Sequence, residues 1–527
     1  MASAAIPADG EAPGAATARP DRALLPVENH GLLLVGIMAA SLLQVLDSTI
    51  ANVAIPHMQS ALGATADTVT WVLTSYIVAS AVAMPITGWL ADRIGARRLF
   101  IGSVAGFILA SMLCGMAQNL PEMVIFRALQ GIAGAFIPAL SQSFMLDTSR
   151  PSRHAQVMAI WGMGIMIGPI LGPVLGGWLT ESASWRWVFY VNLPIGIFSL
   201  AILMSLLPER EAIARRFDLV GFALIGLALA TFQLMLDRGH QLDWFASKEI
   251  WLYAFLAVSG AWVAVIHLST ARAPIFDKAL FADRNFAISL AFMLVIGLVM
   301  FANMALMAPM LQHLFGYSVI DTGMVLMPRG IGVLISMQLA GILVRRGADV
   351  RMVVGAGFAI TAYSQWEMAH WSLATDGWHF VQTGLVQGLG MGLVFIPLNI
   401  AAYATLPPRL RTEGSSLMNL SRSLGASIGI SITTILLAAN IQVGHEELGG
   451  RISGAVLGSL DLTTIDRYQT LGDVALGIVD AEVNRQAAMI AYLNDFYLMA
   501  WFALAAVPLV LFLRPAVGGA PPPPMGE

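Results

Sequence analysis

Two charged side chains stand inside segments that are otherwise apolar. Asp47 lies in the segment 32–56 and Arg127 in the segment 121–146. At 1.5 Å per residue they lie about 13 Å and about 9 Å from the helix ends that we place outside a membrane, so their depths are similar. A nearby cation favours the ionised form of a buried carboxylate, and burial favours its protonated form. We therefore predict a proton-coupling site, with a permanent ion pair that only packs helices as the alternative.

A short basic loop, G-W-L-A-D-R-I-G-A-R-R at Gly88–Arg98, holds the second candidate site. Asp92 follows the C-terminus of a predicted helix, where the dipole is unfavourable for a carboxylate unless a cation or another helix N-terminus compensates. The loop's own arginines are at hand, and the thirteenth predicted span starts on the same side of the membrane. We predict an electrostatic latch on a cytoplasmic gate, formed by Gly88, Asp92, Arg93, Gly95, Arg97 and Arg98. Arginines that only set the topology are the alternative, but they leave Asp92 and the two glycines unexplained.

The segment 155–179 carries glycines and prolines at four-residue spacing. This spacing places the glycines on one helix face, where a neighbouring helix can approach closely. The prolines remove backbone donors and bend the helix. A packing seam of small residues is the alternative, which accounts for the glycines but not for the prolines. The motif consists of Gly164, Gly168, Pro169, Gly172, Pro173, Gly176 and Gly177.

Four further polar residues are candidates for lining a central cavity: Gln44, Gln130, Arg329 and Glu367. Arg329 lies about 12 Å from an outer helix end, near the depth of Asp47. Glu367 is close to a helix end, so a solvated position competes with a role in coupling. The sequence contains no Walker loop, metal-ligand cluster or nucleophilic triad. We therefore expect neither an enzyme nor an ATP-driven pump, and no cofactor beyond a proton gradient as energy source.

The composition is that of a membrane protein, in agreement with these long apolar segments. Of 527 residues, 57% are hydrophobic and 11% are charged, whereas soluble domains carry about 25% charged residues. The net charge of −4 provides no basic field for nucleic acid. Fourteen segments approach the roughly 20 apolar residues of a membrane span: 32–56, 69–90, 99–117, 121–146, 155–179, 187–207, 217–236, 249–270, 286–313, 321–344, 352–371, 377–405, 413–440 and 490–513.

The distribution of basic residues orients these spans. With both termini cytoplasmic, 19 of the 28 Lys and Arg fall in tails and inner loops, six in outer loops and three within spans. That asymmetry is the one expected of inner loops. A second basic loop, Gly341–Arg351, repeats Gly88–Arg98 eight spans later, with Arg345 in the place of Asp92. In a plain twelve-span duplication the two copies would lie six spans apart. An inserted helix pair at 217–270 accounts for the two extra spans.

We therefore predict an all-α polytopic membrane protein of fourteen transmembrane helices, with two six-helix bundles and an inserted pair. The predicted parts are a disordered cytoplasmic tail at 1–29, an N-terminal bundle at 30–208, the inserted hairpin at 209–271, a C-terminal bundle at 272–513 with a long outer loop at 441–489, and a cytoplasmic tail at 514–527.

Several motifs resemble those of the major facilitator superfamily. The loop Gly88–Arg98, R-A-L-Q-G at Arg127–Gly131 and the repeat Gly164–Gly177 resemble its loop, fourth-span and antiporter signatures. The following segments are similar to fourteen-span drug:proton antiporters of the EmrB/QacA type: L-D-S-T-I-A-N-V-A-I-P (46–56), S-W-R-W-V-F-Y-V-N-L-P (184–194), M-P-R-G (327–330) and R-Q-A-A-M-I-A-Y (485–492).

The resemblance implies a major facilitator fold in the cell inner membrane, alternating access, and efflux of drugs or other small amphipathic compounds driven by proton entry. It also implies a periplasmic adaptor protein and an outer-membrane channel as partners. The acidic outer segment 441–489 is a candidate contact for the adaptor or the membrane, with a solvated linker as the alternative. A symporter that imports a nutrient is the alternative function, against which the glycine–proline pattern argues. A non-transporting membrane sensor is a further alternative, but it would need an appended soluble domain to relay a signal, and the sequence shows none.

Overall fold

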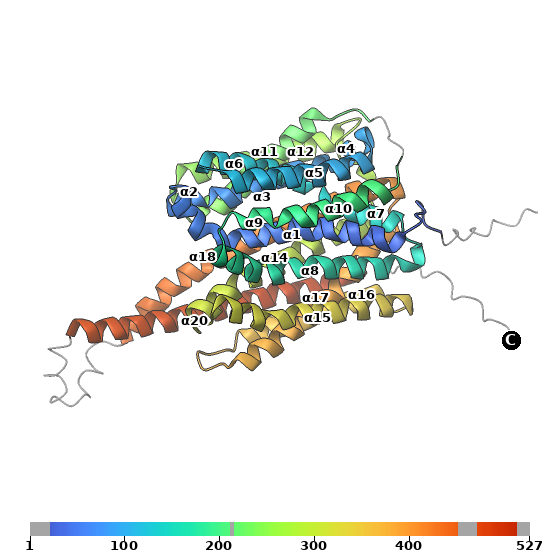
Figure 1. Ribbon diagram of the computed structural model, residues 1–527. Helices are drawn as coiled ribbons and strands as arrows, with labels where there is room; N and C mark the ends of the chain where they lie inside the picture. Colours follow the sequence, from blue (N-terminus) through green and yellow to red (C-terminus); the bar gives the residue numbers. More distant parts are fainter. Residues whose placement is uncertain (1–21, 211–214, 452–471, 514–527) are drawn as a thin grey trace, which may run out of the picture.

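The computed structural model describes residues 22–210, 215–451 and 472–513, which form a bundle of roughly parallel helices (Figure 1). Each of the fourteen predicted segments coincides with a helix or with a run of consecutive helices. Within the described residues, twelve of these are long and apolar enough to cross a membrane. The other two are α8 (His154–Ser182) and α16 (Val350–Met368), so the count of fourteen spans stays a prediction.

The first part of the bundle consists of helices α1 to α10. Two of its spans are broken, and each break holds a proline that cannot continue the hydrogen-bond ladder: Pro85 lies in η1 and Pro138 in the first turn of α7. The elements are α1 (His30–Ala61), α3 (Trp71–Ala83), η1 (Met84–Ile86), α4 (Thr87–Ile94), α5 (Ala96–Met116), α6 (Leu120–Ala135), α7 (Ile137–Asp147), α8, α9 (Trp187–Tyr190) and α10 (Asn192–Leu206).

The remaining helices follow in chain order. Several begin at an Asp or Ser whose side chain accepts a hydrogen bond from the first turn, as in α14, α15 and α17. They are α11 (Leu219–Gly239), α12 (Lys248–Thr270), α13 (Lys278–Ala282), α14 (Arg284–His313), α15 (Val319–Arg345), α16, α17 (Gly377–Ala404), α18 (Arg411–Arg451) and α20 (Gly472–Leu509).

Helix packing brings together helices that are distant in the chain. Helix α1 packs against α8 and α10, and α6 packs against α3 and α5. In the second part, α14 packs against α18, and α17 against α15 and α16. The two parts meet where α8 contacts α15 and where α7 contacts α18. This arrangement is compatible with the predicted pair of bundles.

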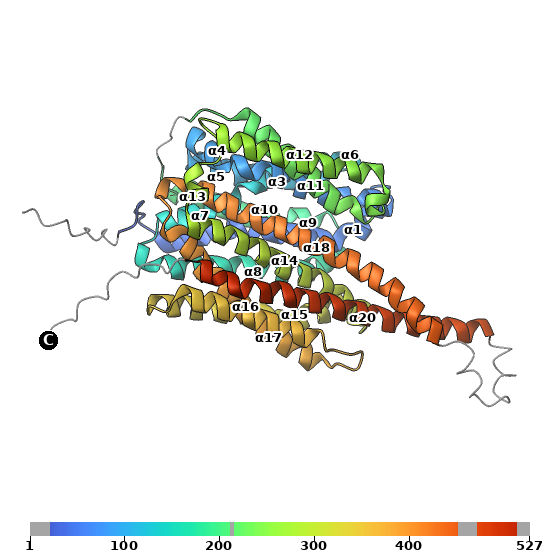
Figure 2. The same cartoon turned by 180° about the vertical axis from the view of Figure 1, so that it is seen from behind.

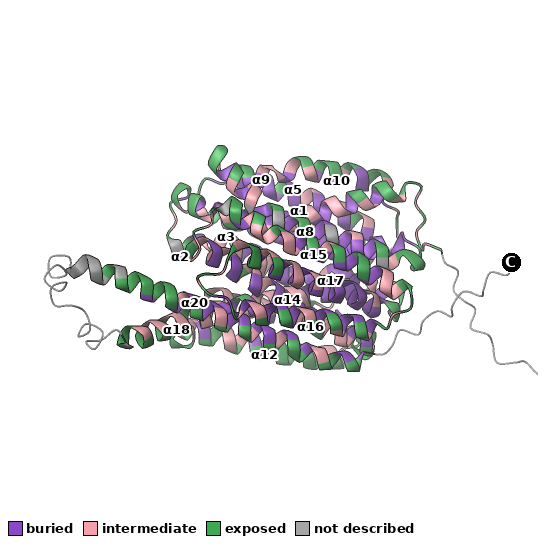
Figure 3. Ribbon diagram, turned by 90° about the horizontal axis from the view of Figure 1, so that it is seen from below, coloured by how far each residue is buried: buried purple, intermediate pink, exposed green. Residues whose placement is uncertain are grey.

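Buried residues face the interior of the bundle and exposed ones cover its outside (Figure 3). Helices α11 and α12 pack on each other, and α11 joins the bundle through α3 and α18. On α12, Trp251, Phe255, Val258 and Trp262 are 60–71% exposed. Such a contiguous row of large apolar side chains suits contact with lipid rather than with water.

Helices α18 and α20 project beyond the other helices as a pair (Figures 1 and 2). Helix α18 does not end at residue 440, where the thirteenth predicted span stops, but continues to Arg451. The two helices touch along the projection: a Cβ on Gly444 would lie 3.2 Å from the Ala487 Cβ, and His445 Nδ1 is 2.9 Å from Asn484 Oδ1. The predicted outer segment 441–489 is therefore helical in its described parts.

Candidate functional site

The predicted pair of Asp47 and Arg127 meets in the interior, where Asp47 is 0% and Arg127 1% exposed. The Arg127 Nη1 donates to Asp47 Oδ2 over 2.7 Å. The other carboxylate oxygen, Oδ1, accepts from Gln130 Nε2 over 2.8 Å and from Asn192 Nδ2 over 2.7 Å. Three donors therefore hold one carboxylate between α1, α6 and α10. We call Asp47, Arg127, Gln130 and Asn192 the Asp47 cluster.

The guanidinium of Arg127 is held on several sides. Its Nε donates to the Val72 carbonyl over 3.1 Å, and Nη1 also donates to Gln130 Oε1 over 2.8 Å. The ring of Tyr76 lies 4.4 Å from the guanidinium carbon, a distance typical of cation–π contact. Gln44 donates to the Tyr76 hydroxyl over 3.1 Å. Of the predicted cavity residues, Gln130 thus belongs to the Asp47 cluster and Gln44 reaches it through Tyr76.

Sequence reasoning missed Asn192, Tyr76 and Ser111. Asn192 is fully buried, and its Nδ2 also donates to Ser111 Oγ over 3.0 Å. Its Oδ1 has no partner among the described residues. The available signal was an amide inside an apolar segment, a position that is costly unless the amide has a partner. Asn192 lies in the segment 184–194, whose similarity to drug:proton antiporters does not by itself assign a role to the residue.

The glycines of α8 bring that helix against α1, the helix that carries Asp47. A Cβ on Gly168 would lie 2.8 Å from Val45 Cγ1, and one on Gly176 would lie 2.9 Å from Ile50 Cγ1. Gly164 and Gly172 face Met38 and Thr49 in the same way. Pro169, Pro173 and Gly177 lie within α8, which continues unbroken to Ser182.

The predicted latch residue Asp92 is paired, but not by its own loop. Its Oδ2 is 3.1 Å from Arg215 Nη1, and the same nitrogen is 3.1 Å from Glu413 Oε2 in the first turn of α18. Burial opposes the charge of Arg215, but Glu413 and Asp92 raise its pKa above the usual value. We call Asp92, Arg215 and Glu413 the latch triad, and the end of the molecule where they lie the Asp92 end.

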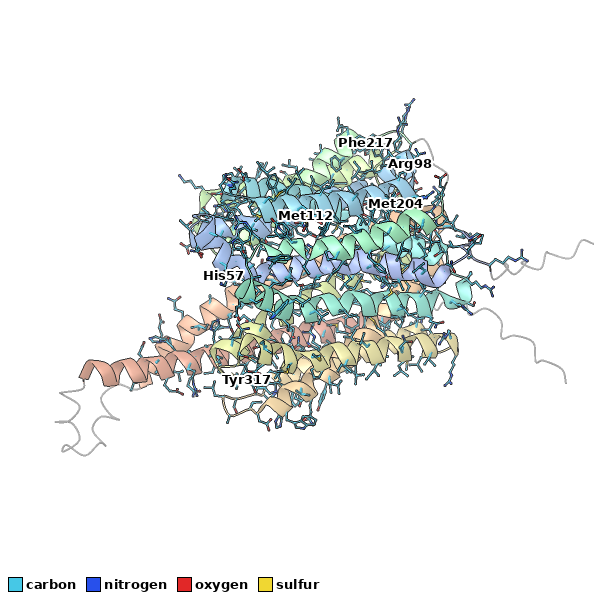
Figure 4. The ribbon with its side chains drawn as sticks, in the orientation of Figure 1. His57, Arg98, Met112, Met204, Phe217 and Tyr317 are labelled. Atoms are coloured by element: carbon cyan, nitrogen blue, oxygen red, sulfur yellow. The ribbon has the colours of Figure 1, made fainter. Side chains whose placement is uncertain are left out.

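The cation beside Asp92 is not one of the loop's own arginines. Arg93 and Arg98 are exposed, Arg98 at the surface of the Asp92 end (Figure 4). Arg97 instead pairs with Glu209 over 3.4 Å. The cation comes from Arg215, which lies 123 positions along the chain and carries no local signal.

The two loop glycines have separate structural reasons. A Cβ on Gly88 would lie 2.9 Å from the Glu413 Cβ, so a larger residue would push α4 away from α18. Gly95 has φ of +92°, a backbone conformation that favours glycine. It forms the turn between α4 and α5.

Other polar contacts join the two parts of the bundle at the Asp92 end. Asp147, which is 1% exposed, is 2.7 Å from Arg411 Nη1 and 3.0 Å from Arg210 Nη2. On α7, Gln142 Oε1 accepts from Asn419 Nδ2 and from the Tyr403 hydroxyl, each over 3.2 Å. Helix α7 is thereby tied to α17 and α18.

The two other predicted cavity residues lie on α15 and α16. Arg329 on α15 donates through Nη1 to Asn303 Oδ1 over 2.8 Å and through Nη2 to the Met300 carbonyl over 3.2 Å. Asn303 in turn donates to Gln365 Oε1 over 3.0 Å. Glu367 is half-buried in the last turn of α16 and forms no ion pair with the described residues.

Comparison with known families decides what kind of protein carries these sites. The sequence model of the Major Facilitator Superfamily matches residues 37–430. The chain belongs to the major facilitator superfamily. This major facilitator protein is a membrane transporter and not an enzyme, as the motifs predict.

Relatives within the superfamily cover nearly the whole chain. The multidrug export protein EmrB of Escherichia coli (strain K12) is 34% identical over 510 residues, 94% of this chain and 97% of that protein. EmrB of Haemophilus influenzae is 35% identical over 516 residues, 94% and 98% of the two chains. The fatty acid resistance protein FarB of Neisseria gonorrhoeae is 34% identical over 487 residues, 90% and 94%. The predicted EmrB-type membership is confirmed.

A solved structure shares the fold of this major facilitator protein. The human organic anion transporter MFSD10 (TETRAN) matches with a TM-score of 0.54 and 13% identity, over 90% of this chain and 99% of that one. This likeness concerns the fold alone. Within the described ranges, no group of three or more His, Cys, Asp or Glu is placed to hold a metal ion.

Proposed function

We propose that this transporter is a proton-coupled antiporter that exports drugs or other small amphipathic compounds across the inner membrane by alternating access. The observation that carries the proposal is the Asp47 cluster, in which a fully buried carboxylate accepts three hydrogen bonds, one of them from a cation. The names of the EmrB relatives support the direction of transport. The energy source is the proton gradient, and no other cofactor is involved.

Protonation of Asp47 changes what this cluster can hold together. The ionised pair of Asp47 and Arg127 is neutral as a whole, and its hydrogen bonds join α1 to α6 and α10. A proton on the carboxyl group removes an acceptor and leaves the Arg127 charge without its counter-ion. Proton binding therefore favours a different arrangement of these helices, which is the differential stability that coupling requires.

The Asp92 end is the cytoplasmic gate in this proposal, with both chain termini in the cytoplasm. The latch triad and Asp147 hold that gate closed through charges from both parts of the bundle. Alternating access needs two bodies that move against each other. We assign these to residues 30–208 and 272–513, with the pair 209–271 inserted between them.

The projecting pair of α18 and α20 is the proposed contact for a periplasmic adaptor protein, which would lead to an outer-membrane channel. The pair extends away from the Asp92 end (Figure 2), and therefore into the periplasm. Its exposed charges include Asp480, Glu482 and Arg485. A polar surface of this kind suits a partner in water better than lipid.

The test of proton coupling is drug transport driven by a pH gradient in proteoliposomes, with drug binding measured separately. Asp47→Asn mimics the protonated form permanently, so we expect gradient-driven transport to be lost while the drug still binds. Asp47→Glu keeps an ionisable group and should retain partial activity. Asp480→Asn, which makes the same change to an exposed acid of the projecting pair, is the matched control. Gradient-driven transport by Asp47→Asn at the wild-type rate would place the proton site elsewhere.

The direction of coupling separates export from the alternative, a symporter that imports a nutrient. In inside-out vesicles with an acidic lumen, outward proton flow should drive an exported drug into the lumen. A symporter would instead move its substrate out of the lumen with the protons. Substrate leaving together with protons would refute the antiporter.

A further inference from the structure

The second part of the bundle contains a counterpart of the Asp47 cluster. R-A-L-Q-G at Arg127–Gly131 on α6 corresponds to G-L-V-Q-G at Gly384–Gly388 on α17. The backbone contacts correspond as well: a Cβ on Gly131 would overlap the Tyr76 carbonyl of α3, and one on Gly388 would overlap the Arg329 carbonyl of α15. Gln387 therefore takes the place of Gln130, and Arg329 takes the place of Tyr76.

The two clusters differ in charge. In the first, the carboxylate of Asp47 neutralises Arg127. In the second, the group that accepts from Arg329 Nη1 is the neutral amide oxygen of Asn303. No carboxylate of the described residues forms an ion pair with Arg329. The charge of half-buried Arg329 thus has no counter-ion among the described residues, although it lies in a membrane helix, where isolated charges are costly and mark functional sites.

Hydrogen-bonding capacity is also left unused on α16, which Asn303 links to Arg329, and on α17, which packs against α15 at Arg329. Gln387 is 0% exposed, and neither its Nε2 nor its Oε1 has a partner among the described residues. Gln365, which accepts from Asn303, has a free Nε2 and is also 0% exposed. Buried polar groups nearly always have partners, so each exception requires an explanation. Two amide donors and a guanidinium are the groups that an anion would use.

Apolar side chains accompany these donors. Met300 and Met307 on α14 are 7% and 2% exposed, and the Met368 sulfur is 3.3 Å from Asn303 Nδ2. Methionine adapts its shape to apolar ligands of different form. A guanidinium beside methionines and aliphatic groups therefore suits a ligand with an anionic head and an apolar tail.

We propose that Arg329, with Gln365 and Gln387, binds the carboxylate head of the exported compound, so that the substrate class is an amphipathic organic anion. The proposal rests on the export function proposed above and specifies its substrate. Charge compensation is the physical basis: the bound carboxylate serves as the counter-ion of Arg329, as Asp47 does for Arg127 in the first cluster. Asn303 leaves the charge of Arg329 uncompensated, because it accepts a hydrogen bond from Arg329 without carrying a charge.

The test uses three ligands that share a ten-carbon tail: decanoate, decanol and decyltrimethylammonium. Their binding to the purified full-length transporter in phosphatidylcholine nanodiscs is measured by calorimetry. We expect the wild type to bind decanoate most tightly. Arg329→Gln should weaken decanoate binding about tenfold to a hundredfold, the usual worth of hydrogen bonds to a charged group, and leave decanol binding unchanged.

Asn303→Asp provides a second test that keeps Arg329. The new carboxylate pairs with Arg329, as Asp47 pairs with Arg127, and should weaken decanoate binding to a similar extent. If Arg329→Gln does not fold, this variant alone decides. Arg422→Gln is the matched control, because Arg422 donates to Asn419 Oδ1 over 3.1 Å and lies on α18 rather than beside Asn303.

Three results would overturn the proposal: equal decanoate affinity in Asn303→Asp and the wild type, a wild-type preference for decyltrimethylammonium, or loss of decanoate binding in Arg422→Gln alone. Each leaves the proposed export function intact if drugs are still transported. Failure of the export function has a different signature, in which neither the ten-carbon ligands nor a panel of amphipathic drugs moves across the membrane.

Discussion

Asp47 and Arg127 form an ion pair whose members are both almost completely buried. Loss of one partner leaves a buried charge uncompensated, which typically costs about 3–5 kcal/mol, whereas loss of both removes the cost of burying either charge. We therefore expect Arg127→Leu to lower the unfolding temperature strongly. The double variant Asp47→Asn/Arg127→Leu should regain a large part of that loss.

A double-mutant cycle on the detergent-purified protein measures this coupling. The control is Arg98→Leu, which removes an exposed charge at the surface and should change the unfolding temperature little. Purely additive effects of the two single substitutions would show that the pair contributes nothing as a pair.

At the scale of single residues, the sequence identifies buried charged residues well and their neutral hydrogen-bond partners poorly. Asp47 and Arg127 stand out because a charge in an apolar segment is rare. Asn192 and Ser111 resemble the many small polar residues that membrane helices tolerate, and their role depends on which helices pack together. Arg215 was missed for the same reason, because its partners Asp92 and Glu413 are distant in the chain.

At the scale of elements, the contact between α4 and α18 depends on the segment that precedes α11. Arg215 links Asp92 of α4 to Glu413 of α18 through two ion pairs of 3.1 Å. Partly exposed ion pairs are worth up to about 1 kcal/mol each. We therefore expect Arg215→Gln to open the Asp92 end more often, by about tenfold.

A cysteine at Ser415, which is fully buried on α18, reports this opening through its labelling rate with a water-soluble thiol reagent. The background carries Cys114→Ala, so that the native thiol does not react. Arg216→Gln, the exposed neighbour, is the matched control and should leave the rate unchanged. The same labelling rate in Arg215→Gln and Arg216→Gln would remove Arg215 from the gate.

The boundaries of most helices follow from the sequence, but the end of α18 does not. Hydropathy detects where a helix leaves the membrane, and polar residues begin near residue 441. The backbone remains helical to Arg451 because α20 packs beside it, with Ala487 against Gly444. Tertiary contact thus extends a helix past the point where an apolar pattern can reveal it.

At the scale of the whole molecule, the number of membrane crossings determines on which side each loop lies. Helices α8 and α16 are the two predicted spans outside the twelve that meet the length and hydropathy requirement. Ala183 and Ala374 are exposed: Ala183 directly follows α8, and Ala374 lies in the loop between α16 and α17. If both helices cross, as fourteen spans require, both positions face the outside.

Single cysteines at Ala183 and Ala374, in the Cys114→Ala background, should therefore react in intact cells with a thiol reagent that cannot cross membranes. A cysteine at Ala273, in the predicted inner loop after α12, should react only after the cells are permeabilised. Protection of either of the first two positions in intact cells would refute the fourteen-span topology.

The long helix α18 also has a mechanical consequence. Its first turn carries Glu413 of the latch triad, and the same unbroken helix continues for 41 residues to the tip of the projecting pair. At 1.5 Å per residue its length is about 60 Å. A tilt of about 10° around its first turn therefore swings its far end by about 10 Å. In the proposed transport cycle, the helix would act as a lever: a small displacement at the proposed gate would become a large movement at the far end, where the proposed adaptor binds.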